Sequence, residues 1–351
     1  MKMMRAAVVE KPEVVVVKEI PIPEVGDDEV LIKVQYTGIC GSDQSIYRGK
    51  FVPEYLPLVS GHELSGDVAE TGKNVANVKE GDRVIADINI SCGVCFYCRN
   101  GWRLLCPEHR QLGIHTNGAF AEYVKAPARN VLKIPDSLDY LTASFTEPLS
   151  CIMHAVKAMD VKISSSVVVI GCRLGILHAC AAYLRGAAPV ILIGHNEKRL
   201  RIAKEMGVDV VINSHEVEDP VARVLELTEG RGADYVLESV GQPELYELAF
   251  RMIRPGGKVT AFGITAADET MQLKPLDFIV NEQKLAGSKA GEGNDYLEAM
   301  QLLTYNRIDV KKLFSMVVPL EEYESALHEM KENKDLIKVF VSPQIDKRIV
   351  Y

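Results

Sequence analysis

Four cysteines fall within a single segment of 15 residues, as Cys92, Cys95, Cys98 and Cys106. Four thiolates from one short segment satisfy the tetrahedral preference of Zn²⁺, and a site with no open ligand position is structural rather than catalytic. An iron–sulfur cluster is the main alternative, because Pro107 follows the last cysteine. Bacterial ferredoxins, however, place three residues before that cysteine, and here there are seven. The spacing therefore predicts a structural zinc site rather than four unrelated reduced thiols.

A second group of residues could hold another metal ion. Cys40 and Ser42 lie in the run CGSD, and His62 and Glu63 lie in the run GHE that follows. A thiolate, an imidazole and a carboxylate from separate loops could bind Zn²⁺ and leave a position open for substrate. Taken alone, a single cysteine is more often packing and a His-Glu pair is more often a surface dyad. Their occurrence beside the four-cysteine segment makes a catalytic zinc site the better interpretation.

The elements that must position these residues differ between the two parts of the chain. Up to about residue 150, short apolar runs alternate with polar residues and are bounded by Gly, Pro, Asn and Asp, as in Val30–Val34, Val84–Ile90 and Phe120–Val124. Such runs are typical of half-buried strands. This part is predicted to be an antiparallel β domain with irregular loops.

After Ala155, unbroken aliphatic runs alternate with helical stretches. Strands buried on both faces have such runs, and their alternation with helices predicts a doubly wound parallel sheet. The predicted strands are Val167–Ile170, Val190–Ile193, Val210–Ile212, Tyr235–Leu237, Lys258–Phe262 and a weaker one near Leu285.

The end of the chain changes pattern again. Two amphipathic helices, near 295–306 and 320–332, precede a strand at Ile337–Val341, and this tail is expected to return to the first domain. The predicted division is a discontinuous catalytic domain, 1–151 plus 291–351, around a continuous dinucleotide-binding domain, 152–290.

Composition narrows the functional classes. The 351 residues carry 40 basic and 48 acidic side chains, a formal net charge of −8. An acidic balance argues against nucleic-acid or anionic-membrane partners. No window approaches the 18 uncharged apolar residues of a membrane span, and charged residues interrupt the apolar N-terminal runs. We therefore expect a cytoplasmic protein with reduced cysteines, no nucleic-acid partner and no membrane partner.

The ordered motifs resemble the zinc-dependent medium-chain dehydrogenase/reductase family, and in particular its sorbitol, polyol and threonine dehydrogenase branch. The resemblance covers nearly the whole chain and rests on CGSD, GHELSGDV, GDRV at 81–84, the cysteine segment, GAFAEYV at 118–124, EPLSC at 147–151 and RPGG at 254–257. It implies an α/β fold with a GroES-like β-rich catalytic domain and a Rossmann dinucleotide-binding domain.

The resemblance also implies roles for individual residues. Cys40, His62 and Glu63 would be ligands of the catalytic zinc, and Glu147 would be a further ligand or would hold a metal-bound water. Ser42 would pass the proton of the alcohol toward solvent, although a turn-capping role is the simpler alternative. With the four-cysteine site, two Zn²⁺ ions per chain are expected.

The expected chemistry is hydride transfer. Zn²⁺ lowers the pKa of a bound alcohol, so that an alkoxide forms near neutral pH and releases hydride to the nicotinamide. The expected substrate is a secondary alcohol of a polyol or sugar-alcohol type, or the matching ketone. L-Threonine, 2,3-butanediol or a simple alcohol are alternatives, and a phosphorylated polyol is suggested only by the cationic Lys289. A non-catalytic dinucleotide-binding or regulatory homologue is a further alternative.

The cofactor loop departs from the usual pattern, which is G-x-G-x-x-G followed by an acid at the end of the next strand. Here the loop is one residue shorter and contains Gly171, Arg173, Leu174 and Gly175, and Gly194 stands where NAD-preferring relatives place Asp. A missing carboxylate removes repulsion against a 2′-phosphate. We therefore expect a preference for NADP(H) over NAD(H).

Other residues of the predicted cofactor site supply donors, positive charge or backbone at neighbouring strand ends. They are His195, Asn196 and Arg199 after the second strand, and Ser239, Val240 and Gly263 further along. The runs Glu238–Gly241 and Arg254–Gly257 are interpreted as later strand-end loops that border the cofactor. The simpler alternative is that the residues after Gly194 are only the solvated first turn of a helix. The resemblance also implies a homodimer or homotetramer.

Overall fold

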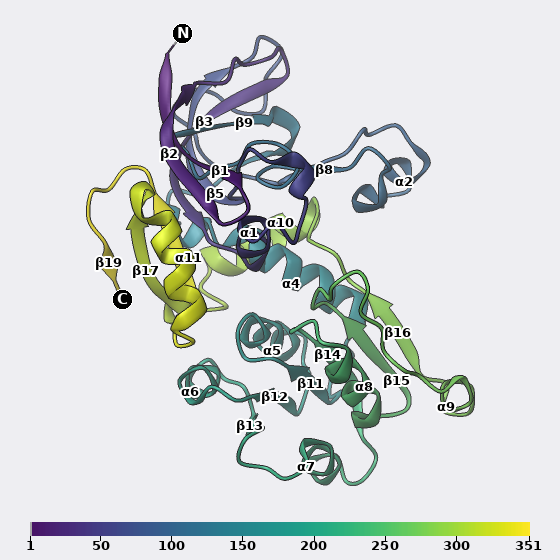
Figure 1. The fold of residues 1–351 in the computed structure, drawn as a ribbon. Helices are drawn as coiled ribbons and strands as arrows, with labels where there is room; N and C mark the ends of the chain where they lie inside the picture. Colours follow the sequence, from purple (N-terminus) through teal and green to yellow (C-terminus); the bar gives the residue numbers. More distant parts are fainter. Residues whose placement is uncertain (1) are drawn as a thin grey trace. The chain divides into compact units, whose positions relative to one another are not determined.

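Antiparallel strands form most of the first part of the chain in the computed structural model, which describes residues 2–351 (Figure 1). The chain divides into two compact units. One contains residues 1–150 and 292–351, and the other contains residues 151–291. None of the helices within the described residues has the length and apolar character needed to cross a bilayer.

The first unit contains three sheets. A three-stranded sheet has the order β2-β1-β4, an eight-stranded sheet has the order β10-β6-β5-β3-β18-β17-β19 with β9 also paired to β3, and β7 pairs with β8. The strands are β1 (Met3–Lys11), β2 (Val14–Pro21), β3 (Glu29–Gly38), β4 (Leu58–Val59), β5 (Glu63–Thr71), β6 (Arg83–Ala86), β7 (Asn89–Ile90), β8 (Arg110–Gln111), β9 (Tyr123–Pro127), β10 (Val131–Lys133), β17 (Phe314–Pro319), β18 (Lys338–Ser342) and β19 (Ile349–Val350).

Short helices connect these strands. They are α1 (Gly41–Tyr47), α2 (Phe96–Arg99), α3 (Tyr140–Ala143), the start of α4 (Thr146–Met159), α10 (Asn294–Thr304) and α11 (Tyr323–Glu332). The predicted helix near 320–332 is a 3₁₀ turn over Leu320–Glu322 followed by α11.

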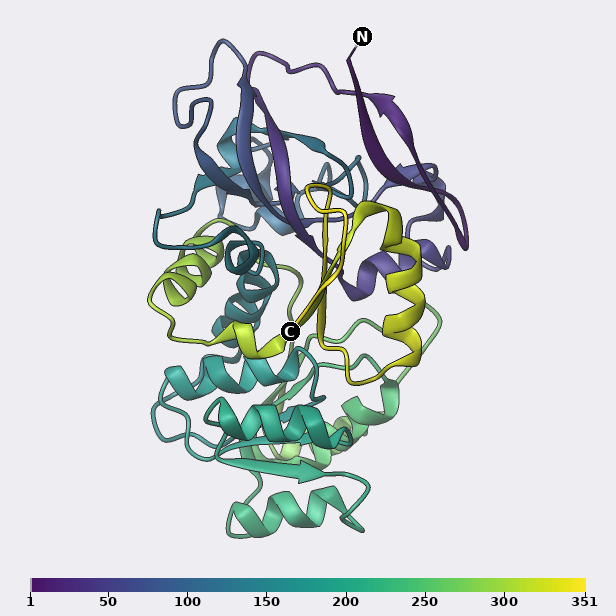
Figure 2. The same cartoon turned by 90° about the vertical axis from the view of Figure 1, so that its left-hand side faces the viewer.

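Two segments far apart in sequence complete the large sheet. Figure 2 shows the yellow C-terminal strands beside the purple N-terminal ones, and β18 pairs antiparallel with β3 through Phe340 with Gly38 and Val341 with Thr37. The alternating residues Val30, Ile32 and Val34 of β3 are fully buried in one core cluster, as their period of two requires. The tail therefore supplies structure to the unit in which the chain begins.

The second unit is a six-stranded parallel sheet of order β13-β12-β11-β14-β15-β16. Right-handed crossovers place α5 and α6 on one face and α7 and α8 on the other (Figure 1). Its elements are β11 (Val167–Ile170), α5 (Gly175–Leu184), β12 (Val190–Gly194), α6 (Glu197–Glu205), β13 (Val210–Asn213), α7 (Pro220–Leu227), β14 (Ala233–Glu238), α8 (Pro243–Met252), β15 (Ile253–Ala261), α9 (Pro275–Val280) and β16 (Lys284–Gly287).

The strand topology confirms the predicted GroES-like and doubly wound classes only at the level of sheets, and three local predictions were wrong. The single strand expected at Val84–Ile90 is divided into β6 and β7, which belong to different sheets. The strand expected at Phe120–Val124 begins at Tyr123, because Phe120 is turned into the core as part of a loop. Arg254–Gly257, interpreted as a loop at a carboxyl strand end, lies at the beginning of β15. Arg254 there donates to Asp234 Oδ1 (2.7 Å) at the amino end of the sheet.

Candidate metal and dinucleotide sites

Cys40, His62 and Glu63 meet where β3 and β5 approach α1. Their ligand atoms, a sulfur, a ring nitrogen and a carboxylate oxygen, all lie within 4.8 Å of one another. His62 is 3% exposed and Glu63 is 1% exposed. Cys40 is half-buried. A thiolate, an imidazole and a carboxylate are the donor types that Zn²⁺ takes in catalytic sites, so the residues fit a zinc ion.

A neighbouring acid orients the histidine. Asp43 is fully buried, and its Oδ1 lies 3.7 Å from His62 Nδ1. Ser42 Oγ lies 3.3 Å from the other ring nitrogen, Nε2. The Nδ1 atom has no hydrogen-bond partner and lies beyond hydrogen-bond distance of Asp43, so this carboxylate acts on the ring through its charge. A carboxylate on the far side of the ring is a common support of a metal-binding histidine.

The same acid also fixes the loop that carries Cys40. Asp43 Oδ2 accepts a hydrogen bond from the Cys40 N–H (2.8 Å), and Oδ1 accepts one from the Gly61 N–H (3.1 Å). Burial raises the pKa of the Asp43 carboxyl. Burial acts to lower the pKa of His62, but the charge of Asp43, the contact with Cys40 and the charge of Glu147 together outweigh it, and the pKa of His62 is raised well above its ordinary value. Asp43 was not assigned a role from the sequence, although it stands in the same CGSD run.

Glu63 has a partner that sequence reasoning missed. Its Oε2 forms an ion pair with the ammonium of Lys338, which is 4% exposed and also donates to the Ile39 carbonyl oxygen (3.2 Å). Lys338 lies in β18, which is beside β3 in the sheet. Nothing in the local sequence marks a lysine 275 residues further on as the partner of Glu63, because only the strand pairing brings them together.

Glu147 lies near this cluster but outside it. It is buried in the first turn of α4, and its charge contributes to the raised pKa of His62. Among the described residues, however, the group of mutually close ligand atoms contains Cys40, His62 and Glu63 without Glu147.

The four cysteines of the second cluster also come together. The Sγ atoms of Cys92, Cys95, Cys98 and Cys106 all lie within 4.8 Å of one another, and the thiols are free. Backbone N–H groups of Val94 and Cys95 lower the pKa of the Cys92 thiol to about 7. Four clustered sulfurs with a thiolate favoured near neutral pH fit a tetrahedral zinc ion. We refer to residues 92–106 as the cysteine lobe.

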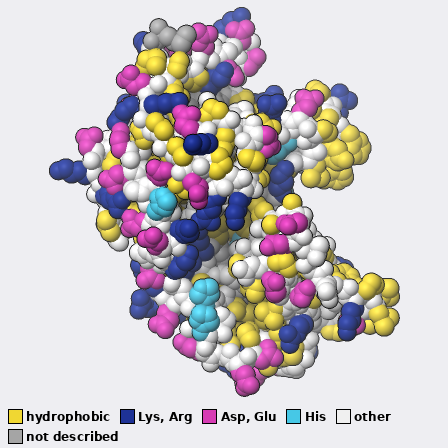
Figure 3. Space-filling model, in the orientation of Figure 1, with side chains coloured by type: hydrophobic (Ala, Val, Ile, Leu, Met, Phe, Trp, Pro, Cys, Tyr) yellow, Lys and Arg dark blue, Asp and Glu magenta, His cyan; other side chains and the backbone are white. Residues whose placement is uncertain are grey.

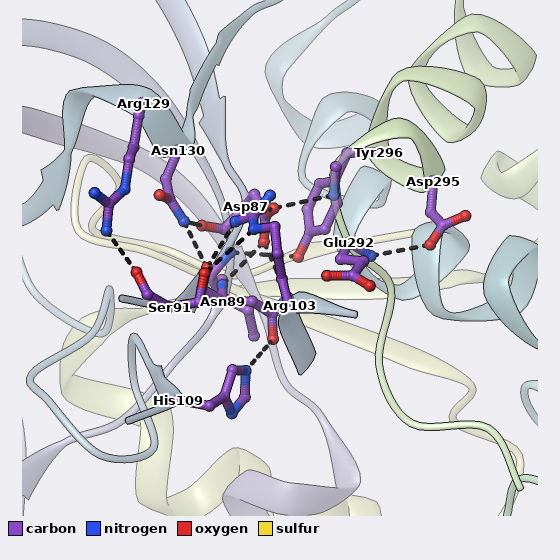
Figure 4. Close-up of polar contacts among 12 residues, drawn as sticks. Asp87, Asn89, Ser91, Arg103, His109, Arg129, Asn130, Glu292, Asp295 and Tyr296 are labelled. Carbon is purple, nitrogen blue, oxygen red and sulfur yellow. Dashed lines mark hydrogen bonds and ion pairs between the residues drawn. The ribbon is translucent and has the colours of Figure 1, made fainter. Parts of the chain in front are cut away.

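A polar network fastens the cysteine lobe to the rest of its unit (Figure 4). The buried Asp87 accepts two hydrogen bonds from Asn89, through its N–H and its side-chain amide (both 2.9 Å). Arg103, inside the lobe, reaches Asp87 Oδ2 (3.5 Å) and the Asn89 carbonyl oxygen (3.1 Å). The N–H of Gly293 also donates to Asp87 Oδ2 (3.1 Å). Asp87 thus links the lobe to the segment before α10.

The predicted dinucleotide residues gather at the carboxyl ends of β11, β12 and β14. Gly171 has φ +109°, and a Cβ there would lie 2.7 Å from Val240 Cγ2, so only glycine fits. A Cβ on Gly175 would meet Val169 Cγ1 at 3.1 Å. The hydroxyl oxygen of Ser239 is buried beside Gly171 with no hydrogen-bond partner. An unpaired buried hydroxyl at this sheet edge fits a polar ligand, as expected for a dinucleotide.

The remaining predicted cofactor residues lie in the turn after β12 and in the loop before α5. Asn196 caps α6, because its side-chain oxygen accepts a hydrogen bond from the Arg199 N–H (2.9 Å), so this oxygen has a structural use. The exposed ring of His195 stacks on His215, with ring centroids 5.1 Å apart. His215 was not predicted; it follows β13, whose Asn213 pairs with Gly194. Arg173 and Leu174 lie in the loop before α5.

Gly263 lies at the end of β15 beside a shallow pocket. The pocket has a volume of about 410 Å³ and is lined by residues that include Tyr246, Ile264 and Thr265. The Tyr246 hydroxyl donates to the Gly263 carbonyl oxygen. The Glu238 carboxylate accepts hydrogen bonds from the N–H groups of Val240 (2.7 Å) and Gly241 (3.0 Å), and burial raises its pKa. These contacts fix the strand-end loops that border the predicted dinucleotide site.

Comparisons with known proteins agree with this arrangement. Residues 26–136 match the alcohol dehydrogenase GroES-like domain, and residues 174–305 match the zinc-binding dehydrogenase domain. The chain is 36% identical to an L-threonine 3-dehydrogenase of Bacillus velezensis over 90% of this chain and 92% of the relative. It is 35% identical to a sorbitol dehydrogenase of Halalkalibacterium halodurans, over 93% and 95% of the two chains.

A solved structure is similar over the whole length. A zinc-binding dehydrogenase of Sinorhizobium meliloti, bound to NADP, has a TM-score of 0.91 and 32% identity, with 98% of this chain and 100% of that chain covered.

Proposed function

The chain belongs to the zinc-dependent alcohol dehydrogenase family, and on that premise we propose that it transfers hydride between a secondary alcohol of the polyol type and NADP(H). It is an enzyme of the alcohol dehydrogenase class, with a GroES-like domain and a Rossmann-type domain. The observation that carries the proposal is the cluster of Cys40 with the buried His62 and Glu63, which Asp43 and Lys338 contact. This donor set leaves a ligand position for substrate oxygen.

The roles of the residues follow from their contacts. When bound, Zn²⁺ would supply a Lewis acid that lowers the pKa of the substrate hydroxyl, and the nicotinamide would accept hydride. Cys40, His62 and Glu63 would hold that ion, and the buried carboxylate of Asp43 lies on the Nδ1 side of His62. Lys338 balances the charge of Glu63 in a buried setting. Glu147 is assigned either a fourth ligand position or a hydrogen bond to water at the open position.

Ser42 is the proposed proton relay. Its hydroxyl lies on the Nε2 side of His62, the side assigned to substrate. The capping function that could otherwise explain a hydroxyl here belongs to Asp43, whose carboxylate accepts from the Cys40 N–H. The Ser42 hydroxyl is therefore available to take a proton from the substrate alcohol and pass it toward solvent.

The substrate class is the finer part of the proposal. A buried carboxylate at position 147, rather than a cysteine, is the feature that favours the polyol-like branch. L-Threonine is the second candidate, because relatives named L-threonine 3-dehydrogenase are as similar as those named sorbitol dehydrogenase. 2,3-Butanediol and simple alcohols share the same chemistry and differ only in loop contacts.

The preference for NADP(H) rests on the end of β12. Gly194 offers no carboxylate to repel a 2′-phosphate, and His195 and Arg199 lie in the following turn. With the cysteine lobe as a closed structural site, the complete enzyme would hold two Zn²⁺ ions.

Assembly into a homodimer or homotetramer is supported by exposed apolar surface and an open sheet edge. β16 is paired to β15 along one side, and the neighbouring α9 exposes Leu276, Ile279 and Val280. Hydrophobic side chains also gather on the cysteine lobe (Figure 3), where Phe96 is 67% exposed and Trp102 is 52% exposed. Exposed apolar patches of this kind mark interaction surfaces. The free thiols support the proposed cytoplasmic location.

The function is tested by assaying the purified, zinc-loaded protein for formation of reduced nicotinamide. The panel contains polyols, polyol phosphates, L-threonine, 2,3-butanediol and simple alcohols, each with NAD⁺ and NADP⁺. The proposal expects the highest kcat/KM for a polyol with NADP⁺, and two zinc ions per chain. Preferred turnover of L-threonine would replace the substrate class, and a zinc-loaded protein that binds no dinucleotide would favour a regulatory homologue.

A further inference from the structure

Gly194 is a glycine for reasons of space rather than backbone conformation. It ends β12 and is absent from the glycines with positive φ, so its backbone would accept any residue. A Cβ on Gly194, however, would lie 2.5 Å from both Cβ and Sγ of Cys172. Two carbon atoms do not approach so closely without displacing one of the chains that carry them.

Cys172 cannot easily move out of this position. It is 6% exposed, and its Cβ is fixed to the backbone of the loop that joins β11 to α5. The preceding residue, Gly171, donates its N–H to the Ile193 carbonyl oxygen (2.8 Å), which clamps the loop against β12. On its other side, Val240 Cγ2 fills the space that a Cβ on Gly171 would need (2.7 Å). The loop is thus held between two strand ends, with the side chain of Cys172 directed at Gly194.

We infer that Cys172 determines coenzyme specificity by occupying the space in which a side chain at position 194 would begin. The shortened loop and the missing acid are then linked. The loop places Cys172 against the end of β12, and the side chain of Cys172 leaves no space for an aspartate at position 194. This inference rests on the proposed NADP(H)-dependent function and adds the residue that enforces it. Cys172 acts through position 194 and is therefore a positioning residue.

Two histidines lie at the strand end from which a carboxylate is excluded. His195 follows Gly194 directly, and its ring stacks on that of His215, which follows the paired strand β13. Both rings are exposed and carry N–H donors, which suit the oxygens of a phosphate group. The His195–His215 pair is thus placed where the ribose 2′-phosphate of NADP(H) would lie, and Cys172 keeps a competing carboxylate away from it.

The steric part of the inference is tested by thermal melting of the dinucleotide-free protein. Gly194→Ala adds only the Cβ, and overpacking of this kind should lower Tm by about 5 °C in the wild-type background. In the Cys172→Gly background the same substitution should lower Tm by no more than about 1 °C, because the opposing atoms are gone. Cys172→Ala, which removes only Sγ, is a second background in case the glycine variant fails to fold, and should give partial relief.

The specificity part is tested by fluorescence titration with NADPH and NADH. Gly194→Asp alone should raise the Kd for NADPH at least about tenfold without lowering the Kd for NADH, because the acid displaces the loop. Gly194→Asp combined with Cys172→Gly should bind NADH more tightly than NADPH. Replacing both His195 and His215 with alanine should raise the Kd for NADPH about tenfold and leave the Kd for NADH unchanged, since charge-assisted bonds to phosphate are lost.

The outcomes separate the inference from the proposed function. Equal Tm losses for Gly194→Ala in all backgrounds, or tight NADH binding by Gly194→Asp alone, would overturn the role of Cys172. If the wild-type protein prefers NADH, the proposed NADP(H) preference is wrong. In that case the dependence of the Gly194→Ala effect on residue 172 still decides whether the two positions exclude each other.

Discussion

The two candidate zinc sites lie in the same unit but are built in opposite ways. The cysteine lobe takes all four ligands from 15 consecutive residues, and its cysteines donate to and accept from one another and the local backbone. The other site takes its ligands from the end of β3 and the start of β5, and each ligand depends on a second residue, Asp43 or Lys338. The geometry of a site formed by one segment depends only on the conformation of that segment. The geometry of a site formed by several strands depends on how those strands pack in the sheet.

Removing a ligand from the assembled site should have the largest effect on the reaction. Cys40→Ala should lower the zinc content from two ions to one and reduce kcat/KM by about a thousandfold or more, because a Lewis acid supplies several kcal/mol to this chemistry. Metal analysis and steady-state kinetics would measure both. Cys180→Ala, a buried thiol on α5, is the matched control and should keep both zinc ions and the rate. A Cys40→Ala protein that turned over normally would mean that this cluster is not the reaction centre.

Loss of the orienting acid should have a smaller effect. Asp43→Asn keeps the shape but removes the charge behind His62, and zinc affinity or kcat should fall about 10- to 100-fold, the usual range for such supporting residues. Competition with a chelator would measure the affinity. The cysteine lobe serves as an internal control, since its zinc should be released at an unchanged chelator concentration. Equal weakening at both sites would show that Asp43 acts on the stability of the fold and not on His62.

Breaking the buried ion pair should affect stability more than rate. Lys338→Met leaves the Glu63 carboxylate buried without its cation and should destabilise the zinc-free protein by about 3–5 kcal/mol, measured by denaturant unfolding. Lys338→Arg keeps the charge and should restore most of the loss. If Glu63 is a zinc ligand, saturating zinc should reduce the penalty of Lys338→Met, because the metal replaces the missing positive charge. A penalty that does not change with zinc would argue that Glu63 is held by Lys338 and does not bind the metal.

A change in the lobe should have the smallest effect on the rate. Cys95→Ser should remove one zinc ion and leave kcat per remaining zinc within about threefold of wild type, because hydrogen bonds of Ser91 with Arg129 and of His109 with Asn89 still hold the residues on either side of the lobe. Limited proteolysis should cut within residues 92–106 sooner than in wild type. A loss of rate as large as that of Cys40→Ala would remove the distinction between the two sites.

This contrast also explains what could be predicted from the sequence. The parallel strands β11, β12 and β13 were recognisable because each contains a continuous apolar run, and the cysteine lobe was recognisable because its four ligands fall within one short segment. Cys40, His62 and Glu63 could be proposed, but Lys338 could not, since its partner lies on another strand of the sheet. His215 and the contact between Cys172 and Gly194 were likewise invisible, because strand register, and not spacing, brings those residues together. Phe120 was misassigned because an apolar residue in a buried loop has the same pattern as one in a strand.

The pairing of β18 with β3 has a consequence for synthesis on the ribosome. The second unit is continuous in sequence and can fold as soon as it has emerged, because its strands need nothing that is translated later. The first unit begins earlier but must wait for residues near 340 before β3 gains its neighbour and Glu63 gains its cation. A chain truncated before Lys338 would therefore have a folded Rossmann-type unit and an incomplete metal centre. The protein can become active only after the last part of the chain has been synthesised.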